Sequence, residues 1–431
     1  MLMKQNICKT RAGSRGYSRL ASVLTVLALL LTAATGAWAQ TETYTVRMKK
    51  GTKDADKWTV TPANATTTGV AKDTPVSLTY GGRLKVKDVT AKFAPIDLSE
   101  LTEDYTAKNG DVLTGTLDGQ TQPYKITIAD GATVTLDNVT INGVNDGNCL
   151  WAGLTCDGSA TIILKDGSTN TVKGFDDDYP GIFVPKGSTL IIKGEAAGTG
   201  ALTASPFDGG GTNDSYGAGI GGGYVSDCGN IEIQGGNITA TGGYYSAGIG
   251  AGDEGACGTI TISGGNIMAT GGDLAAGIGG GYDGPSCGGI TISGGTITAT
   301  GGDWAAGIGS GYYGSSCDGI TISGGTITAT GGHEAAGIGS GSSNGFPGDP
   351  ISSCGTISIT TGVTKVTATK GSGADNSIGA GYNSKCGKVT IGCTLDGGNP
   401  VGGTVYWDGS DYQYGGGTYL TQATITYEPS N

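Results

Sequence analysis

The chain has 431 residues, 85 of them glycine, and carries a formal net charge of −12 at neutral pH. This acidic balance excludes nucleic acid as an expected partner, because binding to phosphates needs clustered Lys and Arg side chains. The glycines follow no strict three-residue period and apolar residues recur on a regular schedule, which excludes collagen and disordered chains.

Residues 1–39 have the pattern of a secretory signal peptide. Five basic side chains come first, an apolar run from Leu20 to Leu31 follows, and the small-residue motif Ala37-Trp38-Ala39 closes the segment. We expect cleavage near Ala39 and a mature chain that is secreted, periplasmic or held on the outer cell surface. Cleavage leaves 20 basic against 37 acidic side chains, a charge of −17. No second apolar stretch is long enough to be expected to span a bilayer.

Three further segments are predicted beyond the signal peptide. Residues 40–96 are richer in Lys and contain short alternations of apolar and polar residues, which indicates a small N-terminal β-domain. Residues 97–400 show the same alternation of apolar and polar residues at many places, and they are predicted to be a solenoid with irregular early coils. Residues 401–431 are expected to cap its far end, since a bare solenoid end exposes edge strands.

The most regular part, residues 217–354, repeats about every 30 residues. Within one coil, residues 290–293 and 297–300 alternate apolar with polar, so each is predicted to be a strand with one buried face. Paired glycines such as Gly294-Gly295 mark sharp corners, and Ala306 to Gly309 is the expected third strand. Three short strands per coil predict an all-β fold, a right-handed parallel β-helix, with the handedness taken from the general rule for parallel crossovers.

One cysteine falls in each coil of this region and just beyond it. Their spacings are 29, 30, 30, 37 and 32 residues: Cys228, Cys257, Cys287, Cys317, Cys354 and Cys386. We expect a stack of buried thiols, because free Cys is among the most buried residue types. Disulfide bonds between neighbouring coils, and a local one between Cys149 and Cys156, are the alternatives.

Three segments resemble a known family: Ala132–Asn142, Ala160–Val172 and Gly217–Gly223. They are similar to secreted bacterial carbohydrate-binding β-helix proteins, whose fold is like that of pectate lyases, and the resemblance covers roughly residues 97–395. The N-terminal segment resembles a small module of exported proteins from gut Bacteroidetes. The resemblance implies binding of a plant or host polysaccharide, with calcium as a possible cofactor. It does not identify any particular binding residues.

Aligning the coils places aromatic residues in two columns, with carboxylates beside them. Aromatic rings stack on the apolar faces of sugars, and carboxylates accept hydrogen bonds from hydroxyl groups. The predicted binding residues are Tyr224, Tyr245, Asp273, Tyr282, Asp303, Trp304, Tyr312 and Tyr313. The alternative is that these rings cover the turns and shield the coil edges.

No catalytic residue is predicted. A polysaccharide lyase needs a cationic base, and no Lys or Arg occurs between Lys193 and Lys365. Asp273 and Asp303 would be neighbours in adjacent coils, as a retaining glycosidase requires, but corner residues of a repeat are expected to be solvated. The single histidine, His333, rules out a zinc site built from several histidines.

The triplet Asp176, Asp177 and Asp178 is the candidate calcium site, with a plain polar loop as the alternative. A calcium-dependent lyase in the more basic early coils is a less favoured function. The main prediction is an exported, non-catalytic, polysaccharide-binding protein, and the alternative is an extracellular adhesin or structural rod that binds a protein. A Thr-x-Thr ladder, with Thr298 and Thr300 in one coil, would suit ice binding, but Thr is also the ordinary residue of an exposed strand.

Overall fold

The computed structural model describes residues 95–391 except 145–146, 208–214, 345 and 361, and the backbone of strands β1–β6 and β36–β39. The chain divides into two units, residues 1–94 and 95–431. The predicted signal peptide, N-terminal domain and C-terminal segment lie largely outside the described residues. Within the described part of the chain, no helix is long and apolar enough to cross a membrane.

The first unit contains two antiparallel sheets. One joins β1 (Leu27–Leu31), β2 (Thr43–Met48) and β4 (Val70–Ala71). The other joins β3 (Trp58–Thr61), β5 (Val76–Tyr80) and β6 (Val89–Ala91). Strand β1 falls inside the segment predicted to be removed as a signal peptide.

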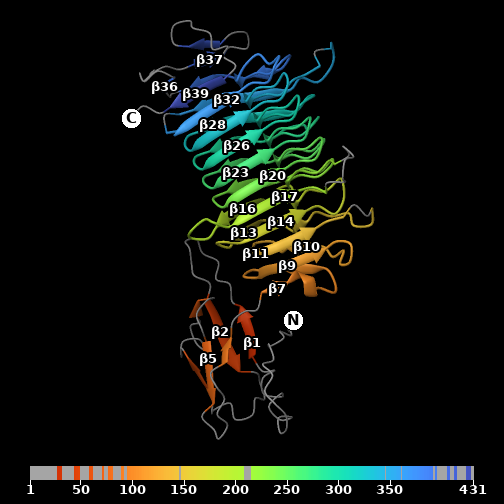
Figure 1. Cartoon of the computed structure of the whole chain (residues 1–431), viewed down its shortest axis with the longest axis vertical. Helices are drawn as coiled ribbons and strands as arrows, with labels where there is room; N and C mark the ends of the chain where they lie inside the picture. The colour runs from red at the N-terminus through yellow and green to blue at the C-terminus, as the bar shows by residue number, and fades with distance from the viewer. Residues whose placement is uncertain are drawn as a thin grey trace. The chain divides into compact units, whose positions relative to one another are not determined.

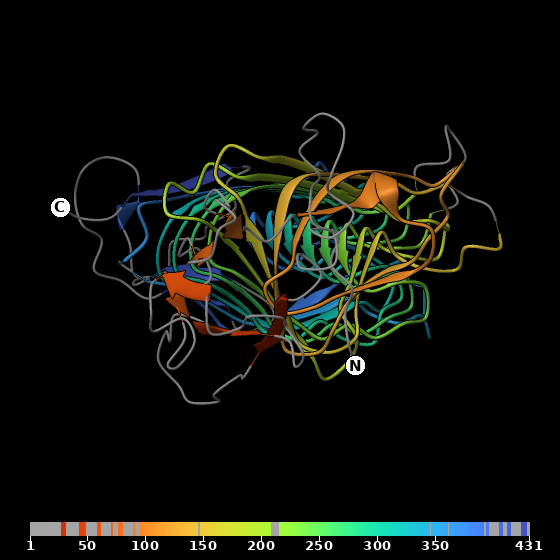
Figure 2. The ribbon, with the colours of Figure 1, turned by 90° about the horizontal axis from the view of Figure 1, so that it is seen from below.

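The second unit is a right-handed parallel β-helix, which confirms the predicted fold class. Each coil contributes one strand to each of three parallel sheets, and successive coils stack in register (Figure 1, Figure 2). Sheet 1 consists of β8 (Tyr105–Ala107), β10 (Ile126–Ile128), β12 (Leu154–Cys156), β15 (Ile182–Phe183), β18 (Ile220–Gly221), β21 (Ile249–Gly250), β24 (Ile278–Gly279), β27 (Ile308–Gly309), β30 (Ile338–Gly339) and β33 (Ile378–Gly379).

The other two sheets hold the longer strands. Sheet 2 consists of β13 (Ala160–Leu164), β16 (Thr189–Gly194), β19 (Asn230–Ile233), β22 (Ile260–Ile262), β25 (Ile290–Ile292), β28 (Ser316–Ile322), β31 (Ser353–Ile359), β34 (Lys385–Cys386) and β35 (Val389–Ile391). Sheet 3 consists of β14 (Thr169–Lys173), β17 (Ala201–Ser205), β20 (Asn237–Thr241), β23 (Asn266–Thr270), β26 (Thr296–Thr300), β29 (Thr326–Thr330) and β32 (Lys365–Thr369).

Both ends of the stack carry irregular elements. At the start, β9 (Val112–Asp118) and β11 (Ala132–Asn142) each run through sheets 2 and 3, and the short 3-10 helix η3 (Leu98–Glu100) follows β7 (Ile96–Asp97). At the far end, β39 (Thr424–Glu428) pairs antiparallel with β32 and with β36 (Thr394–Leu395). Strands β37 (Val405–Trp407) and β38 (Tyr412–Tyr414) form a hairpin pair.

The core is built from columns of identical side chains. Parallel register places Ile292 between Ile262 and Ile322, and all three are fully buried. Thr residues between the buried positions point outward, as the alternation predicts, and the Thr-x-Thr ladder of sheet 3 is interrupted by the exposed Met268. Because each coil buries its apolar side chains only against the coils above and below, the stack has one continuous core.

Sheet 1 requires glycine at the end of each regular strand. Gly309 has a φ of 138°, and a Cβ there would lie 1.8 Å from the carbonyl oxygen of Gly339 in the next coil. The backbones of successive coils therefore approach more closely than any side chain permits. The expected third strand, Ala306 to Gly309, is present as β27, which comprises only Ile308 and Gly309, paired with Ile338 and Gly339 of the next coil.

The cysteines of the ladder are buried thiols, as expected. All eight cysteines among the described residues are free and buried, including Cys149 and Cys156, so neither disulfide alternative occurs there. Neighbouring ladder positions pair in parallel, Cys287 with Cys317 and Cys317 with Cys354. Burial raises the pKa of the Cys156 thiol to about 12, which keeps it protonated and unreactive.

We predict that Gly309→Ala destabilises the fold by roughly 3–5 kcal/mol, because the new Cβ collides with a backbone carbonyl that cannot move independently. Gly187→Ala is the matched control: Gly187 also has a positive φ, 83°, but no atom lies within 4 Å of a Cβ built there. We expect this control variant to lose about 1–2 kcal/mol of folding stability, because only backbone strain acts on it. Thermal unfolding followed by circular dichroism compares the two, and equal losses would contradict the close approach.

We also predict that thiol reagents hardly modify the folded protein. Without the predicted signal peptide the chain has nine cysteines, of which only Cys393 lies outside the described residues, so at most one thiol should react before unfolding. In denaturant all nine should react, without a reducing agent. Fewer than nine reactive thiols in denaturant would reveal disulfides and would contradict the buried thiol stack.

Candidate binding surface

Two turns flank each strand of sheet 1, and they bring the two predicted columns together. The entry turn leads from sheet 3 into sheet 1, and the exit turn leads from sheet 1 into sheet 2. The backbone N–H of Tyr282 in an exit turn donates to the carbonyl of Tyr245 in the entry turn of the preceding coil, at 2.9 Å. Tyr312 donates in the same way to Leu274 at 3.0 Å. The columns therefore interleave along one edge of the stack.

The interleaved turns carry a continuous row of aromatic rings. The rings of Tyr216 and Tyr245 stack at 5.5 Å with an interplanar angle of 4°, and Tyr245 lies 5.1 Å from Tyr282. Tyr282 stacks on Tyr313 at 5.8 Å and 14°. We call this set the aromatic row; it comprises Tyr216, Tyr224, Tyr244, Tyr245, Tyr282, Trp304, Tyr312 and Tyr313.

The aromatic row is accessible from solvent. Tyr224 is 42% exposed, and the other rings are half-buried, so each presents part of its surface. The Tyr312 hydroxyl donates to Asn344 Oδ1 in the next coil. All six aromatic residues predicted from the sequence belong to this row. Sequence reasoning missed Tyr216, although it precedes Tyr245 by 29 residues, one coil length, and so belongs to the same column.

Side chains other than glycine occupy strained positions in the exit turns. Equivalent residues in successive coils have φ between 44° and 56°, the left-handed region that disfavours a side chain. These residues are Val225, Glu254, Asp283 and Tyr313, and Asn383 at 48° holds the corresponding position two coils later. Glycine would fit there without strain. Non-glycine residues in such a conformation are enriched at binding and active sites, which marks the exit turns as a candidate site.

A buried carboxylate lies within the aromatic row. Asp253 holds the exit-turn position that Tyr282 and Tyr312 hold in later coils, is only 4% exposed, and its Oδ1 has no hydrogen-bond partner. Burial raises the pKa of Asp253 to about 7, and the nearby charges of Glu254 and Asp283 act in the same direction. Near neutral pH this carboxyl therefore exists in both protonation states.

Other carboxylates surround the same part of the row. The carbonyl of Asp178 accepts from the N–H of Tyr224 at 2.8 Å, so Asp178 borders the row one coil earlier. Burial raises the pKa of Asp178, with contributions from Asp176 and Asp177, and burial also raises the pKa of Asp283, with a contribution from Glu254. The raised pKa values of Asp178 and Asp283 indicate that neighbouring carboxylates lie close enough to repel one another.

The two remaining predicted binding residues lie at the edge of the row. Asp273 and Asp303 are exposed side chains in successive entry turns. Burial raises the pKa of the Tyr244 hydroxyl, and the charges of both carboxylates raise it further, so both lie near that ring. Their exposure agrees with solvated corner residues.

The predicted calcium ligands do not form a ligand set in this structure. Asp176 is largely buried, and its Oδ1 accepts from the backbone N–H of Asp178 at 3.1 Å, as in a polar turn. Among residues 95–391, apart from the gaps named above, no three His, Cys, Asp or Glu side chains are grouped so as to hold a metal ion. The triplet therefore contributes negative charge beside the row.

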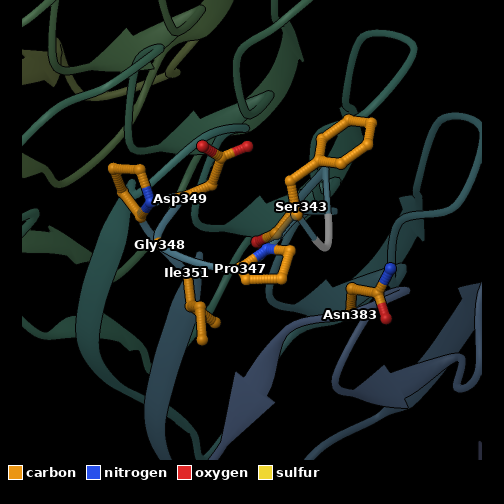
Figure 3. A pocket seen from close by; sticks show the side chains of 8 residues that line it. Ser343, Pro347, Gly348, Asp349, Ile351 and Asn383 are labelled. Atoms are coloured by element: carbon orange, nitrogen blue, oxygen red, sulfur yellow. The ribbon is translucent and has the colours of Figure 1, made fainter.

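A separate hollow lies in the long coil that follows the row. It has a volume of about 320 Å³ and is lined by Ser343, Phe346, Pro347, Gly348, Asp349, Pro350, Ile351 and Asn383. Figure 3 shows Pro347 and Ile351 on this loop, with Asn383 across from them. Phe346 is 70% exposed, so this loop presents apolar surface outside the aromatic row.

Comparison with known proteins agrees with the fold. A family model described as a beta helix repeat matches residues 231–253, 260–282, 290–312 and 320–342. No curated protein and no solved structure matches the chain. Each matched segment runs from a strand of sheet 2 to the next exit turn, so the chain contains four consecutive beta helix repeats that include the central part of the aromatic row.

We predict that Asp253→Asn stabilises the protein at alkaline pH and has little effect near pH 4. The pKa of about 7 in the folded state lies above the ordinary value of about 3.9, so the folded state binds more protons between these values, and stability falls as pH rises through this window. Because the Asn variant carries no charge at this position, its free energy of unfolding above pH 7 should be roughly 2–4 kcal/mol higher. Urea unfolding at several pH values measures this, with the exposed Asp318→Asn as control; a gain independent of pH would contradict it.

Proposed function

We propose that this protein is an exported, non-catalytic polysaccharide-binding protein and that the aromatic row is its binding surface. The observation that carries this proposal is the continuity of the row over several coils. Partly exposed rings that recur from coil to coil suit a polymer whose units also recur at a fixed spacing, because each ring can stack on the apolar face of one sugar unit. Carboxylates and tyrosine hydroxyls beside the rings supply hydrogen-bond partners for sugar hydroxyls.

The strained exit turns support the same proposal. Each non-glycine residue with positive φ costs about 1 kcal/mol relative to glycine. The chain is rich in glycine elsewhere, yet it keeps Glu254, Asp283 and Tyr313 at these positions. Their side chains therefore have a role that outweighs the strain, and all three lie in or beside the aromatic row.

The arrangement of charges favours binding over catalysis. Two lysines of the early coils are paired with carboxylates: Lys165 lies 2.5 Å from Asp137, and Lys186 lies 2.7 Å from Asp227. A lyase base must be free to take a proton from the substrate. Along the row itself the chain has no Lys or Arg at all.

A second candidate function is an extracellular adhesin or structural rod that binds a protein. The exposed Phe346 and Ile351 beside the 320 Å³ hollow favour it, since apolar side chains grouped on an exposed loop are typical of protein contacts. This surface is distinct from the aromatic row, so variants can separate the two functions.

We predict that Tyr282→Ala combined with Trp304→Ala lowers the affinity for a bound polysaccharide by roughly 10- to 100-fold without unfolding the stack, because each stacked ring contributes about 1 kcal/mol. The mature protein is first screened on immobilised plant and mucosal polysaccharides, and the variant is then tested on those that retain it. Phe346→Ala is the matched control, since it removes an exposed ring outside the row.

The same screen tests the other functions. Addition of calcium and of a chelator tests the cofactor that the resemblance admits, and ultraviolet absorbance detects the unsaturated products of a lyase. Loss of binding in the Phe346 variant alone would move the binding site to the hollow. Retention of no polysaccharide would overturn the proposal in favour of the protein-binding rod.

A further inference from the structure

The part of the chain that carries the aromatic row has no positive side chain to balance its acids. Between Lys193 and Lys365 there is no Lys or Arg, and the one histidine, His333, lies 4.0 Å from the carboxylate of Glu334. The same stretch contains 13 carboxylates: Glu195, Asp208, Asp214, Asp227, Glu232, Asp253, Glu254, Asp273, Asp283, Asp303, Asp318, Glu334 and Asp349. Any positive charge that balances the row must come from outside this stretch.

Four carboxylates gather around the rings of Tyr224 and Tyr282. Asp178, Asp253 and Glu254 all raise the pKa of the Tyr224 hydroxyl, the largest effect coming from Glu254. Burial raises the pKa of Tyr282, and the charges of Asp283 and Asp253 add to it. We call Asp178, Asp253, Glu254 and Asp283 the carboxylate cluster.

Asp253 gives the cluster an unsatisfied acceptor. Its side chain is more than nine-tenths buried and Oδ1 receives no hydrogen bond, and the backbone N–H of the adjacent Glu254 donates to the carbonyl of Tyr282 in the next coil, at 3.0 Å. A buried acceptor without a donor destabilises a protein by about 1–3 kcal/mol. The charged and titratable groups that act on it are Asp178, Glu254, Asp283, Tyr224 and Tyr282, and none is a cation. Such a site is complementary to a ligand that brings both positive charge and N–H donors.

The tyrosine rings beside the carboxylate cluster indicate which kind of cation would bind there. No group of described side chains is arranged to hold a metal ion, and metal ions do not need aromatic surface. An ammonium group donates hydrogen bonds to carboxylates and is also attracted to the face of a tyrosine ring. When that ammonium is attached to a sugar, the apolar face of the sugar can stack on the next ring of the row.

We propose, on the basis of the polysaccharide-binding function above, that the ligand is a cationic polysaccharide built from amino sugars with free amino groups. The ammonium groups contact the exposed Glu254 and the half-buried Asp283, and the sugar rings stack along Tyr224, Tyr245 and Tyr282. Asp253 lies beneath these contacts as a positioning residue, and its Oδ1 is a buried acceptor without a hydrogen-bond donor. A neutral polymer of the same shape binds more weakly, because it leaves the cluster unbalanced.

The test compares two oligomers of equal length by isothermal titration calorimetry at mildly acidic pH: one of glucosamine and one of N-acetylglucosamine. Acetylation removes the positive charge and keeps the sugar backbone. We expect the glucosamine oligomer to bind roughly tenfold tighter, and this preference should shrink as salt is added.

Two double variants with the same change in charge locate the effect. Glu254→Gln with Asp283→Asn should abolish the preference for glucosamine. Glu232→Gln with Asp318→Asn, on strands β19 and β28 of sheet 2, should leave it unchanged. Removing repelling carboxylates does not threaten folding, and thiol protection confirms that each variant is folded.

Each outcome decides the proposal. Equal affinity for both oligomers, or tighter binding of the acetylated one, overturns the cationic ligand and leaves the polysaccharide-binding function standing. Equal loss of preference in both double variants overturns the assignment to the carboxylate cluster. Binding of oligolysine with no binding of either oligomer, together with a blank polysaccharide screen, overturns both proposals in favour of a basic protein partner.

Discussion

The parallel register of the coils is the constraint on which the rest of the structure depends. Each coil is too thin to bury its own apolar side chains, so Ile262, Ile292 and Ile322 are buried only because they lie directly above one another. The same register that stacks the core also stacks everything on the outside. A ring or carboxylate in one turn is therefore held near its counterpart in the next coil, and a row of like groups forms without any further interaction to align it.

Much of this was predictable because the sequence period equals the structural period. The alternation in residues 290–300 and the paired glycines predict two strands and their corners, and Ala306 to Gly309 predicts the third. What the period does not show is how turns on different sides of sheet 1 meet. Tyr245 and Tyr282 are in separate columns of the sequence, and only the backbone hydrogen bond between coils makes them neighbours. The burial of Asp253 was unpredictable for a similar reason, since its equivalents in the two adjacent coils are the exposed Tyr224 and the half-buried Tyr282.

Stacking also explains why the carboxylate cluster is energetically unusual. In most folds a carboxylate can be paired with a base from another element, as Lys165 pairs with Asp137 in the early coils. In the regular coils every turn is a near copy of its neighbour, so a segment without bases places acid next to acid. Glu254 and Asp283, one coil apart, illustrate this, because the charge of Glu254 raises the pKa of Asp283. Repulsion of this kind is relieved by protonation, as at Asp253, or by a cation from outside.

The exit turns show how such a stack can tolerate a destabilised surface. A solenoid gains stability from each added coil, so the small strain at Glu254, Asp283 and Tyr313 is offset by the Ile columns on the other side of the same coils. Core and surface residues are thus separated within each repeat: Ile and Gly positions are restricted by the close approach of backbones, whereas turn positions can change without disturbing the stack. Position 253 carries Asp where the adjacent coils carry Tyr224 and Tyr282, which changes the charge of the row, and the register of β21 on β24 is nevertheless regular.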